Sequence, residues 1–182
     1  MPNPRARLIL TTAIATLLGA GAAGALGAFV VVRAGWYDIG ATTQHFQPVY
    51  DLLEQAMHDS VRRHALSVAA PALGAHDQVL RGAGVYRDNC AQCHGGPGTA
   101  PGNHGLSMQP VPGPLVDASR HWKPRELYWI TRHGIKMSGM PAWEYHLSED
   151  ETWAAVAFVL QLPVLSAADY RALTAPGAET KR

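Results

Sequence analysis

The sequence CAQCH, residues 90–94, contains the only two cysteines of this 182-residue chain. Cys90 and Cys93 are three positions apart, and His94 follows directly. A structural disulfide, a zinc site and a thioredoxin-like redox pair are the common uses of cysteines so close together. Each of these uses requires further features of the chain, and the sequence shows whether those features are present.

None of the three uses fits the rest of the sequence. A disulfide between cysteines separated by two residues closes a very small loop and stabilises little. A zinc site needs a second pair of ligands, and no other cysteines are present. A thioredoxin-like pair follows a strand, whereas the residues before Cys90 have a helical pattern. Covalent attachment of a haem is the remaining use, and it alone employs all three fixed positions.

The spacing suits haem attachment for a geometric reason. The two sulfurs, from Cys90 and Cys93, can form thioethers with the two vinyl-derived carbons on one porphyrin edge, and His94 can then bind the iron from below. The sequence has no second Cys-x-x-Cys-His, so we expect one covalent haem c.

A six-coordinate haem needs another axial ligand, and methionine is a common one in electron carriers. The candidates are Met108, Met137 and Met140. We favour Met140, because Gly139 before it permits close backbone approach and Pro141 after it fixes the turn. A histidine ligand or an open site remains the alternative. We expect the other histidines to be exposed or structural, among them His104, His121, His133 and His146.

An apolar run from Leu8 to Val32 precedes the motif by more than fifty residues. It is long enough to cross a bilayer as a helix, and Arg33 closes it. A cleaved secretory signal is the alternative, but its apolar region is shorter. Both interpretations place the rest of the chain outside the cytoplasm, and the basic residues before the run favour the same orientation.

Two further features concern partners. Gly19, Ala23 and Gly27 lie on one stripe of the apolar run, where another transmembrane helix could pack closely, although the chain is rich in Ala and Gly throughout. The 15 basic and 14 acidic side chains nearly balance, which gives no indication of nucleic-acid binding.

Helical patterns dominate the exported part, and no alternating run long enough for a strand occurs. The chain has an amphipathic pattern from Val49 to about Val68, and a long Gly- and Pro-rich stretch without regular structure from Gly95 to Pro114. Further helices are predicted at residues 76–89, from Pro124 to the stop at Gly134, and from the capping box of Ser148 and Glu151 to Pro163.

Three segments resemble the class I c-type cytochromes, in particular the single-haem cytochrome c subunits of bacterial terminal oxidases. They are GAGVYRDNCAQCHG, ELYWITRHGIKMSGMPAW and EDETWAAVAFVLQLP, within residues 77–163. The resemblance implies an all-α fold with three main helices around one haem, Cys90 and Cys93 attached to it, and His94 and Met140 on its iron. It also implies that Gly82 lets the first helix cross the last one near Tyr86, Trp153 and Phe158.

The resemblance leaves the surroundings of the haem open. The carbonyl that orients the proximal imidazole could belong to Pro97, to Pro101 or to neither. Candidate partners of the haem propionates are Trp122, Trp129, Trp143 and Arg125, although Trp129 and Trp143 are equally well explained as core residues.

We therefore expect a cytochrome anchored in the bacterial inner membrane, with its haem domain in the periplasm. It would pass single electrons between redox proteins such as a periplasmic dehydrogenase, an oxidase or another cytochrome. A fixed subunit of a larger complex and a peroxidase or gas sensor with an open sixth site are the alternatives. The expected segments are a cytoplasmic N-terminus (1–7), a transmembrane anchor (8–33), a periplasmic linker with the amphipathic helix (34–72), the cytochrome c domain (73–170) and a C-terminal tail (171–182).

Overall fold

The computed structural model describes residues 3–177, and the chain forms two compact units that divide between Gly40 and Ala41. The first unit consists of one long helix, α1 (Pro4–Arg33), which Asn3 caps by accepting a hydrogen bond from the Arg5 backbone N–H. Most of its 30 residues are apolar, and none of them is buried. By length and composition α1 is able to cross a membrane, as expected from the apolar run.

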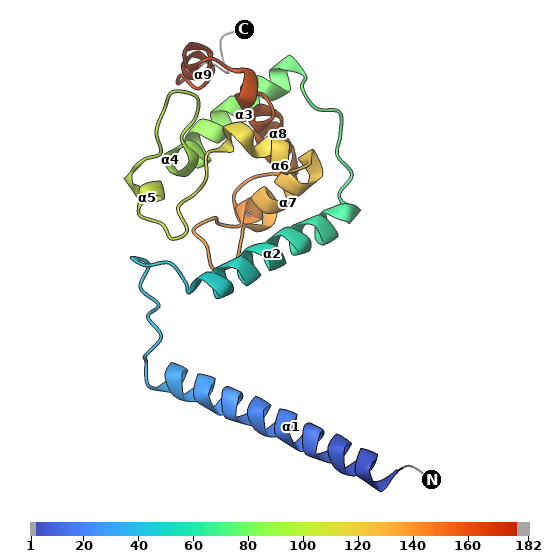
Figure 1. Ribbon diagram of the computed structural model, residues 1–182. Coiled ribbons are helices and arrows are strands. Elements are labelled where there is room, and N and C mark those ends of the chain that lie inside the picture. Colours follow the sequence, from blue (N-terminus) through green and yellow to red (C-terminus); the bar gives the residue numbers. More distant parts are fainter. Residues whose placement is uncertain (1–2, 178–182) are drawn as a thin grey trace. The chain divides into compact units, whose positions relative to one another are not determined.

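The second unit is all-helical in the part of the chain that the structure describes, with a single isolated β-bridge between Gly96 and Thr99 (Figure 1). Its α-helices are α2 (Gln47–His64), α3 (His76–Asn89), α4 (Ala91–His94), α5 (Asn103–Leu106), α6 (Ala118–His121), α7 (Pro124–His133), α8 (Glu149–Val159) and α9 (Ala167–Leu173). Short 3-10 turns complete it: η1 (Ala65–Ser67), η2 (Leu115–Asp117), η3 (Trp143–Tyr145) and η4 (Leu162–Val164).

The core forms where α3 crosses α8, as the resemblance implied. A Cβ added at Gly82 would lie 2.0 Å from the Ala154 carbonyl oxygen, so glycine is what permits this crossing. Tyr86 and Phe158 are fully buried beside it, with ring centroids 5.3 Å apart. The α8 helix starts from the predicted capping box at Ser148, and it is buried from Thr152 to Val159.

The α7 helix packs on the other side of α8. The rings of Tyr128 and Trp153 stack with centroids 4.1 Å apart, and Leu127 is also buried. Pro124 begins α7 and Gly134 ends it, as predicted. Ile130 and Thr131 on the same helix are only half-buried.

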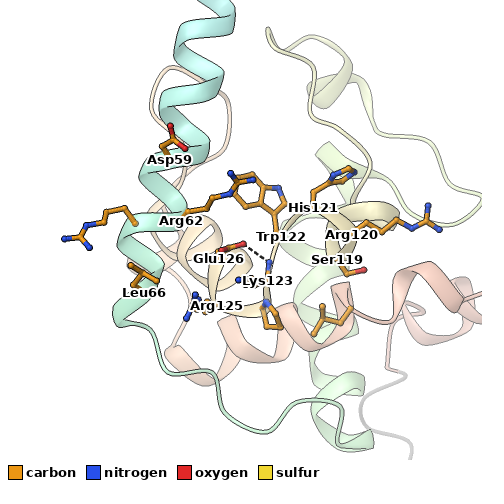
Figure 2. Close-up of a pocket in the computed structure, with 13 residues that line it drawn as sticks. Asp59, Arg62, Leu66, Ser119, Arg120, His121, Trp122, Lys123, Arg125 and Glu126 are labelled. Carbon is orange, nitrogen blue, oxygen red and sulfur yellow. Dashed lines mark hydrogen bonds between the residues drawn. The ribbon is translucent and has the colours of Figure 1, made fainter.

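The α2 helix packs against α7 and so belongs to the second unit, although it lies in the segment we expected to be a linker (Figures 1 and 2). Val61 and Ala65 are buried at this contact, and His58 stacks on Trp122 with ring centroids 4.5 Å apart. The first half of α2 behaves differently, because Val49, Leu52 and Leu53 remain exposed. The regular helix ends at His64, and a 3-10 turn continues the pattern to Ser67.

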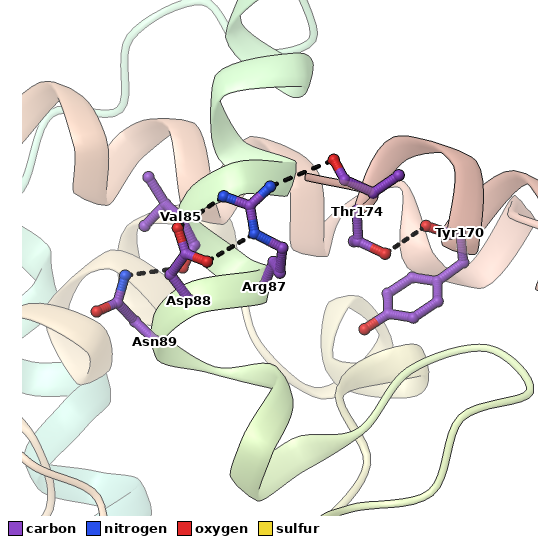
Figure 3. Close-up of polar contacts among 7 residues, drawn as sticks. Val85, Arg87, Asp88, Asn89, Tyr170 and Thr174 are labelled. Atoms are coloured by element: carbon purple, nitrogen blue, oxygen red, sulfur yellow. Dashed lines mark hydrogen bonds and ion pairs between the residues drawn. The ribbon is translucent and has the colours of Figure 1, made fainter. Parts of the chain in front are cut away.

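Two short helices were not predicted. The loop from Gly95 to Pro114 contains α5, a single turn, where we expected no regular structure. The α9 helix follows a Ser166 cap and continues past residue 171, where we placed the start of the tail. It is joined to α3, because the Arg87 guanidinium donates to the Ala175 carbonyl at 3.3 Å just beyond α9 and also pairs with Asp88 (Figure 3).

Candidate haem site

The two cysteines lie on one helical turn. Cys90 ends α3 and begins α4, and its carbonyl accepts hydrogen bonds from the backbone N–H groups of Cys93 and His94, each at 3.0 Å. Residues three apart on such a turn share a face. Both thiols are free, with Cys90 buried and Cys93 half-buried. Burial, together with the neighbouring Cys93, raises the pKa of the Cys90 thiol to about 12.

His94 ends the same turn and is oriented by a backbone carbonyl. Its Nδ1 lies 2.8 Å from the carbonyl oxygen of Gly113, 19 residues further along the chain. The acceptor is therefore neither Pro97 nor Pro101. If Nδ1 carries the hydrogen, Nε2 keeps its lone pair, which is the tautomer a metal ligand needs. Burial lowers the pKa of His94, and the hydrogen bond to Gly113 opposes that shift only in part, so the ring is held neutral.

The loop after His94 folds tightly back over α4. The Gly102 N–H donates to the Gln92 carbonyl at 2.9 Å, and a Cβ on Gly105 would lie 2.6 Å from the Cys93 carbonyl oxygen. The Gly95 carbonyl accepts hydrogen bonds from the hydroxyls of Tyr86 at 2.9 Å and Tyr170 at 3.3 Å. These contacts join the turn of residues 90–94, which we call the attachment turn, to the core and to α9.

Met140 lies in a second loop, which its own hydrogen bonds hold closed. The Ile135 N–H donates to the Met140 carbonyl at 3.2 Å, and the Met140 N–H donates to the Ser138 hydroxyl at 3.1 Å. Gly134 starts this loop with φ +67°, and a Cβ there would lie 2.7 Å from the Met140 carbonyl oxygen. The loop therefore fixes the backbone of Met140 tightly.

The three candidate methionines differ in their surroundings. Met137 is 70% exposed, whereas Met140 and Met108 are half-buried. Met108 packs on Gly139, because a Cβ at that glycine would lie 2.2 Å from the Met108 sulfur. This contact joins the loop that carries Gly113 to the loop that carries Met140, so the structure brings the proximal and distal candidates into one connected region.

The candidate propionate partners lie mostly around α2. Trp122 stacks on His58, and Trp129 lies between His64 and His133, with ring centroids 5.5 Å and 4.7 Å away. Trp143 lies near His146, with centroids 6.2 Å apart. Whether any of these residues, or Arg125, meets a propionate stays a prediction. As expected, the side chains of His104, His121, His133 and His146 are exposed.

The donor set fits a covalently bound haem better than a bare metal ion. No group of three or more His, Cys, Asp or Glu side chains that could hold a metal occurs among residues 3–177. Two free thiols share one turn, and the next residue is an imidazole whose other nitrogen is already hydrogen-bonded. Glycines at 102 and 105 keep the following loop close to this turn.

Residues 77–159 match the protein family described as cytochrome C oxidase, cbb3-type, subunit III. These residues form a c-type cytochrome domain. The matched segment of the cytochrome domain begins within α3 and ends with α8, so it includes the attachment turn, the loop of Gly113 and the loop of Met140. No curated protein and no solved structure matches the chain.

A cytochrome c domain contains a haem and transfers electrons, which confirms the predicted class of function. The structure gives three residues roles that the sequence-based description of this domain did not assign to them. They are Gly113, which orients His94, Met108, which packs on Gly139, and Tyr170, which donates to Gly95. Only Tyr170 could have been noticed in the sequence, because Ser166 and Asp169 just before it form the start of the helix that carries it.

Proposed function

We propose that this protein is a membrane-tethered, periplasm-facing cytochrome c that passes single electrons between two redox proteins. In this proposal Cys90 and Cys93 attach one haem, and His94 and Met140 bind its iron. The observation that carries the proposal is the attachment turn within a cytochrome domain, with His94 already oriented by the Gly113 carbonyl.

When bound, the haem supplies a reversible one-electron change between Fe(III) and Fe(II). The residues of the chain have supporting tasks. The hydrogen bond from His94 to Gly113 fixes the ring and its tautomer, so the ligand does not reorient when the charge of the site changes. The hydrogen-bonded loop of Met140 restricts the distal ligand in the same way. Fixed ligands keep the reorganisation on electron transfer small.

The tether supports the role of a carrier. The α1 helix is long and apolar enough to span a bilayer, and Arg33, Trp36 and Tyr37 follow where interfacial residues are common. Anchoring raises the effective concentration of the domain near membrane partners, so a small and weak docking contact is sufficient. The expected donor and acceptor are a periplasmic dehydrogenase, an oxidase or another cytochrome.

Spectroscopy of the oxidised, haem-loaded protein tests the axial ligands. We expect a sulfur-to-iron charge-transfer band in the wild type, its loss in Met140→His and its retention in Met137→Leu, because Met137 is exposed. A wild type that lacks the band and readily binds added ligands would overturn the carrier proposal. That result would favour the peroxidase or gas-sensor alternative.

A second candidate is a fixed subunit of a larger dehydrogenase or oxidase complex. The name of the matched family favours it, since that name describes a subunit of an oxidase. Gly19, Ala23 and Gly27 would then form a contact stripe for another transmembrane helix. Purification in mild detergent distinguishes the two cases, because a fixed subunit leaves the membrane in stoichiometric complex with its partners.

A further inference from the structure

A groove of about 840 Å³ lies between the C-terminal half of α2 and the segment that leads from α6 into α7 (Figure 2). It belongs entirely to the second unit, and no residue of the attachment turn or of the Met140 loop lines it. Trp122, Pro124 and Leu160 supply part of its apolar wall. The groove is therefore separate from the proposed ligands of the iron.

Its charged lining is strongly unbalanced. Five cationic side chains line the groove, and Asp59 and Glu126 are the only acidic ones. The cations are Arg62, Arg63, Arg120, Lys123 and Arg125. Glu126 is buried, and its carboxylate accepts the Lys123 backbone N–H at 2.8 Å. Even with both acidic side chains counted, the five cations leave an excess of three positive charges. An anion entering this groove would meet an excess of positive charge.

Three of the cations lack a partner of their own. Within residues 3–177, no ion pair or side-chain hydrogen bond involves the guanidinium groups of Arg62, Arg63 and Arg125. Arg120, in contrast, pairs with Asp117 at 3.3 Å. Arg62 and Arg63 are exposed and can be satisfied by water, but the Nε of Arg125 is buried.

The positive charge of the lining is the observation that indicates an anionic ligand. The Nε of Arg125 is closed to solvent, and this side chain is also a candidate partner of the haem propionates, so it does not identify the ligand of the groove. An oxyanion in the groove could accept hydrogen bonds from the exposed guanidinium groups of Arg62 and Arg63. Arginine side chains bind phosphate well because their planar fork matches its oxygens.

We propose that this groove binds a phosphate group, and that the phosphate belongs to the headgroup of an anionic phospholipid. The lipid source rests on the proposed membrane tether, whereas the phosphate chemistry of the groove does not. Thirteen residues, 34–46, connect α1 to α2, and fully extended they span about 45 Å. The domain is thus confined to the neighbourhood of a surface that is rich in phosphate. The apolar wall suits the glycerol and upper acyl part of a lipid.

The test uses full-length, haem-loaded protein in nanodiscs. Backbone hydrogen exchange is measured over residues 60–66 and 119–126 in three conditions: discs of zwitterionic lipid, discs with added anionic phosphatidylglycerol, and zwitterionic discs with inorganic phosphate. We expect slower exchange in both segments with the anionic lipid. Protection by inorganic phosphate as well would support the phosphate site and add a soluble ligand. Protection in neither condition would overturn the proposal.

Variants link the effect to the groove. We expect Arg62→Gln and Arg63→Gln each to weaken binding about tenfold, as the loss of one charge-assisted hydrogen bond does. Arg81→Gln is the matched control, because Arg81 is exposed on α3 and pairs with Asp77 outside the groove.

A fourth condition tests whether the groove binds an acidic protein instead of a phosphate group. A glutamate-rich peptide is added to zwitterionic discs, and exchange is measured over the same two segments. If this peptide protects them while neither phosphate source does, the groove is a contact for acidic proteins and the phosphate assignment is wrong. The proposed function fails separately, through the loss of the sulfur-to-iron band, which none of these exchange measurements reports.

Discussion

Gly82 lies where α3 crosses α8, and the space for a side chain there is already filled. An added Cβ would lie 2.0 Å from the Ala154 carbonyl oxygen and 3.0 Å from the Phe158 Cβ. Alanine normally stabilises a helix relative to glycine by about 1 kcal/mol. Here we expect Gly82→Ala to reduce the free energy of unfolding by about 1–3 kcal/mol, because the helices must separate.

Denaturant unfolding monitored by circular dichroism measures this effect. Arg81→Ala is the control, since it changes the neighbouring residue on the same helix but affects only an exposed ion pair. Its effect should stay within about 0.5 kcal/mol. A stabilised Gly82→Ala protein would mean that the close crossing of α3 and α8 does not exist.

Met108 gives a second prediction at the scale of the residue. Its sulfur packs on Gly139, next to the proposed distal ligand, so Met108→Ala removes a contact that holds the Met140 loop. We expect this change to cost about 1 kcal/mol and to lower the denaturant concentration at which the sulfur-to-iron band disappears. Met137→Ala is the matched control, because that side chain is 70% exposed. Equal behaviour of the two variants would contradict a positioning role for Met108.

The attachment residues could be predicted from the sequence, but their supporting contacts could not. Cys90, Cys93 and His94 are adjacent, so their chemistry is visible in five letters. The acceptor for His94 lies 19 residues away in a loop, and any carbonyl of that loop could have served. Met108 is another case, because its contact with Gly139 depends on how two loops meet.

At the scale of the element, the helices with strong local signals were predicted well. The helix from His76 to Asn89, the Pro124 start, the Gly134 stop and the Ser148 capping box all agree with the structure. The short helices α5 and α9 were missed, since four and seven residues give too little periodicity to recognise. Tertiary contacts, such as those of Gly105 with Cys93 and of Tyr170 with Gly95, stabilise them instead.

The two halves of α2 differ, and this difference can be measured. Val61 is 1% exposed where α2 packs against α7, whereas Leu52 is 69% exposed on the same helix. We expect Val61→Ala to destabilise the domain by about 2 kcal/mol, and Leu52→Ala to change its stability by less than about 0.5 kcal/mol. Thermal unfolding monitored at the haem absorbance compares them. A large effect of Leu52→Ala would show that the first half of α2 is covered.

At the scale of the whole molecule, the two units differ in the environment that each requires. No residue of α1 is buried, and its side chains are apolar along most of its length, which is costly in water but favourable in a bilayer. The second unit has its own core, built from α3, α7 and α8, and α2 adds to it. The folding of the haem domain should therefore not depend on α1.

Replacement of residues 1–33 by a cleavable secretory signal tests this independence. We expect a water-soluble protein with an unchanged haem spectrum and a thermal midpoint within about 2 °C of the full-length protein, because no core contact of the second unit is removed. The full-length chain, as control, should stay in the membrane fraction after washing with high salt. Salt extraction of the full-length chain would argue against an integral anchor. Loss of haem or aggregation of the shortened protein would show that α1 also supports the cytochrome domain.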